Sequence, residues 1–286
     1  MMQIAINTDF FTSTGSPQPI LKAIAEAGFT HLHWCHQWNT DFHYDESEIA
    51  QIKKWLDEYG LTLLDIHGSD GREKCWASTV EYERQAGVAL VANRIKMLAA
   101  LNGTGAVMMH IAYIRRGVTK PEDAPIVWQR VNALKKSINE LLPLMRRLNV
   151  PLALENTAND TFETLENLMG AFPKELVGLC YDSGHGNIGE CEGLNHLEDN
   201  KDRLMALHLH DNNGAGDQHQ PPFMGNLDWK RLADIIARSA YPRQISFEVA
   251  MRCTPFENIP LFLKDAYARC AKFVQMVEDR KLGIRN

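Results

Sequence analysis

Short apolar runs alternate with longer amphipathic stretches from one end of the chain to the other. The runs have the length of buried strands, and the stretches repeat their apolar residues with the period of an α-helix. Strands are predicted at residues 3–7, 30–35, 61–66, 106–110, 151–155, 177–182, 204–208 and 244–249. Helices are predicted at residues 17–27, 48–59, 79–101, 125–148, 161–169, 228–238 and 259–279, with a weak helix near 197–202.

Capping residues and glycines support these boundaries. Three segments have the spacing of a capping box, in which two side chains satisfy free backbone N–H groups: Asp45–Glu48, Ser78–Glu81 and Asp160–Glu163. Glycines, which adopt a left-handed backbone at little cost, follow three of the predicted helices: Gly28, Gly60 and Gly103. The helices therefore have defined starts and ends.

The order of these elements predicts the fold. A helical stretch follows nearly every strand, and no Pro/Ser-rich linker or shift in composition divides the chain. Such a series of β-then-α units predicts one α/β domain over residues 1–286, a single (β/α)8 TIM barrel. An open doubly wound sheet is the alternative, and it is disfavoured because no G-x-G-x-x-G follows the first strand.

The composition fits a large buried core and disfavours several classes of partner. The chain of 286 residues is 45% hydrophobic, yet it has no run long enough to span a bilayer, and its start predicts no signal peptide. The six cysteines form no C-x-x-C pair, which indicates reduced thiols in a cytoplasmic protein. The net charge of −6 disfavours sequence-independent binding to nucleic acid.

Polar residues gather where the predicted strands end. In a (β/α)8 barrel, catalytic groups come from the C-terminal ends of the strands and the loops that follow. The third to eighth strands all end in residue types that bind metals: His67, His110, Glu155, Asp182 with His185, His208 with His210, and Glu248. One such ending is usually a hydrogen-bonded structural residue, but six in succession indicate a shared metal site. Imidazole and carboxylate ligands suit Zn²⁺, Mn²⁺, Co²⁺ or Fe²⁺ better than Ca²⁺, and Mg²⁺ is also a candidate.

The spacing refines some of these assignments. Asp182 and His185 flank a Ser-Gly turn, so both side chains can face one cavity. His208 and His210 share one strand face, and the deeper His208 is predicted to be the ligand. His210 is then expected to support the ligands or contact the substrate. The loop after the seventh strand adds Asp217 and His219, which are explained equally well as solvated polar groups.

Further candidates surround this site. The histidines near the second strand, His31, His33 and His36, are interpreted as partly buried rim residues. Three aromatic residues are candidates for the wall of a small-molecule pocket: Phe11, Trp34 and Trp38. Four arginines in predicted loops could hold a phosphate or carboxylate and are explained equally well as surface charges: Arg72, Arg115, Arg116 and Arg252.

Three stretches, residues 154–156, 181–185 and 208–229, resemble the xylose-isomerase-like TIM-barrel superfamily. This superfamily contains sugar and sugar-phosphate isomerases and epimerases, and also the endonuclease IV group. The resemblance to the isomerases implies one divalent metal held by Glu155, Asp182, His208 and Glu248. The resemblance to the endonucleases implies further metal ligands at His67, His110, His185, Asp217 and His219.

The chain departs from the endonuclease pattern at three places. Phe223 occupies the position after Pro222 where the superfamily signature has glycine. No tyrosine-bearing run follows His67, and no glycine-containing turn follows His110. Phe223 is expected to reshape its loop, and the departures after His67 and His110 argue against a DNA-processing enzyme.

The resemblance implies that the protein isomerises or epimerises a small sugar through an enediolate. Glu155 and Glu248 would move the proton, while His185 and His210 would position substrate oxygens. The alternatives are metal-assisted phosphodiester hydrolysis at abasic DNA, and a related dehydratase or lyase. A binding module without catalysis is the least favoured reading, because polar residues concentrated in this way destabilise a barrel. Barrels of this type often pair, but the sequence does not determine the oligomeric state.

Overall fold

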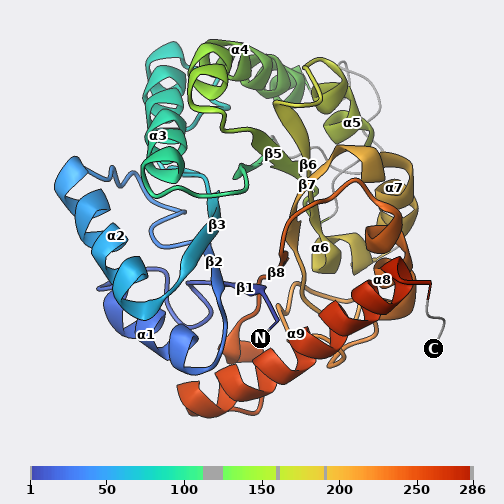
Figure 1. The fold of residues 1–286 in the computed structure, drawn as a ribbon. Helices are drawn as coiled ribbons and strands as arrows, with labels where there is room; N and C mark the ends of the chain where they lie inside the picture. Colours follow the sequence, from blue (N-terminus) through green and yellow to red (C-terminus); the bar gives the residue numbers. More distant parts are fainter. Residues whose placement is uncertain (1, 112–124, 159–161, 190–191, 284–286) are drawn as a thin grey trace.

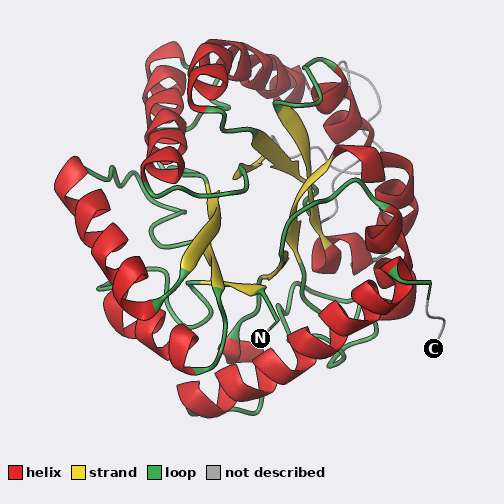
Figure 2. Cartoon of the chain, in the orientation of Figure 1, coloured by secondary structure: helices red, strands yellow, loops and turns green. Residues whose placement is uncertain are grey.

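The computed structural model describes residues 2–111, 125–158, 162–189 and 192–283. Its strands surround a central axis and its helices form an outer ring (Figures 1 and 2). The strands are β1 (Ile4–Asn7), β2 (His31–Trp34), β3 (Thr62–His67), β4 (Val107–His110), β5 (Leu152–Glu155), β6 (Val177–Asp182), β7 (Leu204–His208) and β8 (Ile245–Phe247).

All eight strands belong to one parallel sheet, in the order β7-β6-β5-β4-β3-β2-β1-β8. The sheet nearly closes through Leu209, which forms a parallel bridge with Phe247. The Leu209 N–H donates to the Ser246 carbonyl at 3.2 Å, and the Glu248 N–H donates to the Leu209 carbonyl at 3.1 Å. The predicted (β/α)8 barrel is therefore confirmed.

The helices lie close to their predicted positions. They are α1 (Gln18–Glu26), α2 (Glu46–Tyr59), α3 (Glu81–Ala100), α4 (Pro125–Leu148), α5 (Phe162–Gly170), α6 (Ser183–Asn187), α7 (Gly193–Asn200), α8 (Trp229–Arg238) and α9 (Ile259–Lys281). The weak helix predicted near residues 197–202 is α7 with the following 3-10 turn, and the short α6 was not predicted. Within the described residues, no helix is long and apolar enough to cross a membrane.

One predicted capping box is confirmed and another is wrong. Asp45 accepts a hydrogen bond from the Glu48 N–H, and the Glu48 side chain accepts one from the Asp45 N–H. Helix α3 instead begins at Glu81 with Val80 as its N-cap and without a side-chain cap, and the Ser78 oxygen accepts from the Val80 N–H at 3.1 Å, not from the Glu81 N–H. The segment at residues 160–163 begins outside the described residues.

The glycines after helices follow the expectation at two of three sites. Gly28 and Gly60 have left-handed backbones with φ of 98° and 65°. After α3, Asn102 takes the left-handed conformation with φ of 55°, in place of Gly103. A short polar residue such as asparagine tolerates this conformation better than most others.

The barrel interior has an apolar layer beneath the strand ends. Its members are small or flexible side chains that pack together: Ala106, Met108, Ala153, Cys180 and Ala206. Because side chains alternate across a strand, residues two positions further along face the same interior. These are His110, Glu155, Asp182 and His208. The layer thus forms a floor below the polar residues.

The cysteines that the structure describes are free thiols, as expected. They are Cys35, Cys75, Cys180, Cys253 and Cys270.

Candidate metal centre

Glu155, His208 and Glu248 meet at the C-terminal mouth of the barrel. Glu155 ends β5, His208 ends β7, and Glu248 follows β8 directly. Nδ1 of His208 lies 3.3 Å from Oε1 of Glu155 and 3.0 Å from Oε2 of Glu248. The three residues are 1%, 0% and 8% exposed, so the arrangement is shielded from bulk water.

Asp182, at the end of β6, completes a group of four that we call the four-residue site. One ligand atom from each of Glu155, Asp182, His208 and Glu248 lies within 4.8 Å of the others. The His185 N–H donates to Asp182 at 2.7 Å, which fixes the orientation of the carboxylate.

The chemistry of the four-residue site fits a divalent cation. Nε2 of His208 is buried and has no hydrogen-bond partner among the described residues, while Oε2 of Glu155 has Nε2 of His110 at 3.3 Å. The carboxylates of Glu155 and Glu248 repel each other in this shielded space, and a bound cation would offset the repulsion. Three carboxylates and one imidazole form a ligand set typical of Mn²⁺, Mg²⁺ or Zn²⁺.

The pKa values of the two glutamates also favour the binding of a cation. Burial raises the pKa of the Glu155 carboxyl group, but the nearby His208 and His110 rings outweigh burial and hold that pKa well below its usual value. Burial likewise raises the pKa of Glu248, and His208 overcomes it, so this pKa is also well below normal. Both side chains are therefore ionised and able to bind a cation.

A second group of possible ligands lies beside the first and shares Glu155. Nε2 of His110 lies 3.3 Å from Oε2 of Glu155, and His67 belongs to the same group. Burial lowers the pKa of His67 to about 3, so its ring is neutral. Burial opposes the charged form of His110, but Glu155 and Asp70 raise its pKa to about 10.

A third group consists of His185, Asp217 and His219. Oδ2 of Asp217 lies 3.5 Å from Nε2 of His185 and 3.0 Å from Nε2 of His219. Burial lowers the pKa of His219, but the Asp217 carboxylate outweighs it and raises that pKa to about 9. The loop residues Asp217 and His219 therefore contact the site, which the sequence left undecided.

The superfamily signature holds this loop in place. The Asp211 carboxylate accepts hydrogen bonds from the Trp229 indole at 2.7 Å and from the Leu227 N–H at 3.1 Å. A Cβ atom on Gly225 would lie 2.1 Å from the Asn212 carbonyl oxygen, so only glycine fits there. These contacts tie both ends of the loop to the start of α8.

Phe223 explains why glycine was expected after Pro222. Its backbone is left-handed, with φ of 67°, a conformation that costs a non-glycine residue about 1–2 kcal/mol. Its ring packs 5.4 Å from the Trp229 ring and 4.2 Å from the Lys272 ammonium group. The side-chain packing offsets part of the backbone strain.

Three predicted substrate contacts have different outcomes. His210 is fully buried, and its Nε2 lies 3.0 Å from Asp182, so it supports that carboxylate. Trp34 is 0% exposed and donates to the Tyr44 hydroxyl in the core, so the structure does not place it at the site. Arg252 lies exposed in the 3-10 turn after β8, while Arg115 and Arg116 lie outside the described residues.

Trp38 takes the position expected for an aromatic wall. Its ring lies 4.3 Å from the His67 ring and 5.5 Å from the His110 ring. Its indole N–H donates to Asp9 at 3.2 Å. Trp38 is half-buried, so part of its side chain stays accessible beside these two histidines.

His33 and its partner Asp65 also lie beside the site, which the sequence did not indicate. His33 was interpreted as a rim residue, but it is 0% exposed and its ring lies 4.3 Å from that of His208. Asp65, which is 1% exposed, lies 2.7 Å from His33. The two-residue period of β2 already put His33 on one face with His31, but it does not say which face is interior.

The comparisons with known proteins identify the family. The model of the xylose isomerase-like TIM barrel family matches residues 21–268, so the chain belongs to this family. The uncharacterized protein y4fM of Sinorhizobium fredii (strain NBRC 101917 / NGR234) is 29% identical over 93% of this chain and 90% of its own length.

Similar solved structures show the same fold. A D-tagatose 3-epimerase-like protein has a TM-score of 0.75 at 19% identity, covering 98% of this chain and 99% of its own. L-ribulose 3-epimerase has a TM-score of 0.76 at 15% identity, covering 100% and 99%. The 3-keto-D-glucoside 4-epimerase YcjR from E. coli has a TM-score of 0.72 at 18% identity, covering 95% and 100%.

Proposed function

We propose that the protein is a divalent-metal-dependent isomerase or epimerase of a small sugar or sugar phosphate. The observation that carries this proposal is the meeting of Glu155 and Glu248 at His208, whose Nδ1 is 3.3 Å and 3.0 Å from the two carboxylates. Two carboxylates at one cation position can reach opposite faces of a bound substrate. The epimerase names of the similar structures support a sugar-like substrate.

The proposed chemistry is proton transfer at a carbon next to a carbonyl group. A divalent cation at the four-residue site supplies Lewis-acid stabilisation of the charge that develops on the substrate oxygens. One of the two glutamates removes the carbon-bound proton, and the bonding electrons move to the carbonyl oxygen, giving the enediolate. The other glutamate first takes up a proton from solvent and then delivers it from the opposite face as the electrons return to the carbon, which inverts that carbon. The first glutamate releases the abstracted proton to solvent.

The neighbouring residues suit a small polar substrate. The half-buried Trp38 ring offers an apolar face, and such faces pack well against the C–H surface of a sugar. His185 is 12% exposed at its side chain and lies 3.4 Å from Glu155, so it can reach a substrate oxygen beside the base.

The test is deuterium incorporation. Metal-loaded protein is incubated in D₂O with a panel of ketoses and ketose phosphates, and exchange at carbon is followed by NMR. We expect exchange at the carbon next to the carbonyl, together with a new epimer or isomer. The same spectra would reveal a dehydrated product if the enzyme is instead a lyase. No exchange with any member of the panel contradicts the proposal.

Metal-assisted hydrolysis of a phosphodiester is the second candidate, and a specific observation favours it. The three ligand groups lie side by side, joined by Glu155 and by the contact between Nδ1 of His185 and Asp182 at 3.6 Å. Adjacent metals can activate water and stabilise a leaving oxygen. A nicking assay on a duplex with one abasic site tests this candidate, and intact duplex at high protein concentration contradicts it.

The cytoplasmic location of the protein and the pairing of two barrels stay predictions.

A further inference from the structure

His33 presents an unused nitrogen to the barrel interior. Its Nδ1 lies 2.7 Å from Oδ1 of Asp65, and both side chains are buried. An ionised carboxylate only accepts hydrogen bonds, so this contact places a proton on Nδ1 of His33. With that proton on Nδ1, Nε2 is the nitrogen through which His33 can bind a metal ion.

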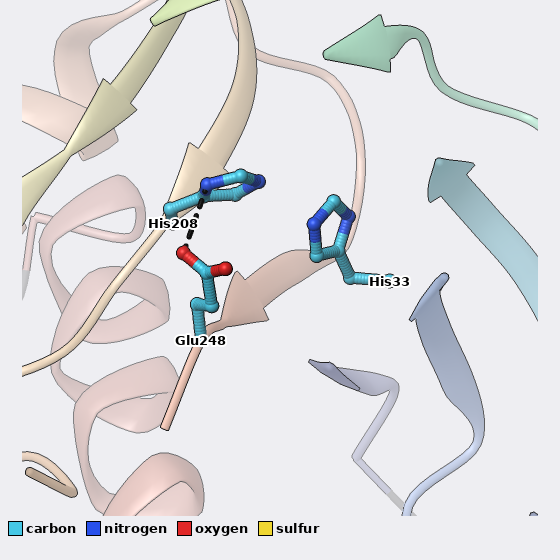
Figure 3. A group of neighbouring side chains, drawn as sticks. All are labelled: His33, His208 and Glu248. Carbon is cyan, nitrogen blue, oxygen red and sulfur yellow. Dashed lines mark ion pairs between the residues drawn. The ribbon is translucent and has the colours of Figure 1, made fainter. Parts of the chain in front are cut away.

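That nitrogen is directed at the metal centre. Figure 3 shows the His33 ring facing His208 and Glu248, and the rings of His33 and His208 have centroids 4.3 Å apart. Nε2 of His33 and Nε2 of His208 are both buried, and within the described part of the chain neither has a hydrogen-bond partner. A buried polar atom without a partner destabilises the fold, so two of them near one space indicate a ligand.

We propose that His33, His208 and Glu248 form a zinc position distinct from the four-residue site. One ligand atom from each of the three residues lies within 4.8 Å of the others. Two imidazoles and one carboxylate are a ligand set used for catalytic Zn²⁺, with the fourth position open. Asp65 orients His33 in the way that carboxylates orient metal-bound histidines.

The two positions differ in their preference for metals. The four-residue site offers three carboxylates and one imidazole, whereas the His33 position offers two imidazoles and one carboxylate. Oxygen-rich sites suit Mn²⁺ and Mg²⁺, and imidazole-rich sites suit Zn²⁺. Zinc therefore selects the His33 position, and manganese selects the four-residue site.

The two positions also exclude each other, because both use His208 and Glu248. A neutral imidazole has one nitrogen lone pair, so His208 binds either through Nδ1 at the four-residue site or through Nε2 beside His33. Zinc at the His33 position consequently removes His208 from the four-residue site. This consequence rests on the proposed function and predicts that zinc inhibits the manganese-loaded enzyme.

The direct test is anomalous diffraction from crystals grown with Zn²⁺ and from crystals grown with Mn²⁺. In the zinc crystals we expect a peak at about 2.0–2.1 Å from Nε2 of His33. A zinc peak elsewhere, or none, overturns the inference. The manganese map separately tests the four-residue site, so failure of the zinc position and failure of the proposed metal centre are distinguishable.

A solution measurement tests the same inference with matched variants. His33→Asn retains a donor for Asp65 but lacks the imidazole lone pair, and we expect its zinc affinity to fall at least about 100-fold. Its manganese affinity is expected to match wild type. The control is His36→Ala, since the His36 ring contacts the Tyr44 hydroxyl and the Gly15 carbonyl instead. Equal zinc affinity in His33→Asn and wild type, with both folded by circular dichroism, contradicts the zinc position.

Discussion

The Asp211 carboxylate accepts a hydrogen bond of 2.7 Å from the Trp229 indole, and this bond joins the two ends of the loop that carries Asp217 and His219. Asp211 is 0% exposed and Trp229 is 4% exposed. The bond thus helps to hold the loop that places Asp217 and His219 beside His185 in the third ligand group.

Trp229→Phe is predicted to loosen this loop. The change keeps an aromatic ring but leaves the buried Asp211 with one hydrogen-bond donor fewer. We expect this to lower the free energy of unfolding by about 1–3 kcal/mol. Urea denaturation measures this loss. Trp55→Phe, at a half-buried position of α2, is the matched control and should cost less. Equal losses in the two variants would contradict the role given to the indole.

Glu155→Gln and Glu248→Gln are each predicted to lower deuterium exchange into substrate by about 10²–10⁴-fold. An amide of the same shape cannot accept the proton. NMR measures the exchange rates, and the metal content of each variant is determined in parallel to separate lost binding from lost proton transfer. Glu175→Gln, at an exposed position, should exchange at the wild-type rate. A variant of Glu155 or Glu248 with wild-type exchange would overturn its assigned role.

Removal of the metal is predicted to lower the thermal stability of the protein. A ligand present at 100 times its dissociation constant stabilises the folded state by about 2.7 kcal/mol. Calorimetry with Mn²⁺ and with a chelator should therefore give melting temperatures several degrees apart. In Asp182→Asn this difference should disappear. Identical wild-type melting temperatures in the two conditions would argue against a bound cation.

Gly184→Ala is predicted to disturb the metal centre through His210. A Cβ atom at position 184 would lie 1.8 Å from Cε1 of His210, so the ring must move away from Asp182. Loss of such a supporting contact typically lowers metal affinity about 10–100-fold. Metal titration measures the effect. Gly170→Ala, where a Cβ atom meets nothing within 4 Å, is the control and should bind normally.

The fold and the gathering of the candidate ligands at one end of the barrel could largely be predicted from the sequence, because both depend on the order of the strands and on the residues that end them. The strand at residues 177–182 was predicted with its observed bounds, and its last residue, Asp182, fell in the cluster. A barrel brings all strand ends to one mouth, so residues that share this position must meet.

Features that depend on register or on tertiary packing could not be predicted. The pairing of β2 with β3 shifts between Leu32 and His33, so that His33 pairs with Asp65, and the sequence pattern does not reveal this register. Trp34 lies one residue further along and is buried in the opposite layer, with Tyr44. Ser78 failed as a helix cap because the helix starts two residues later than the spacing indicates, with Val80 at the N-cap, and the Ser78 oxygen accepts from the Val80 N–H.

The binding of one divalent cation by Glu155, Asp182, His208 and Glu248 is the central claim. It is tested most directly by titrating metal-free protein with Mn²⁺ and following the EPR signal of the free ion. We predict that the wild-type protein removes the signal of at least one Mn²⁺ per chain and that Asp182→Asn does not. Absence of binding by the wild-type protein, or equal binding by Asp182→Asn, would contradict the claim.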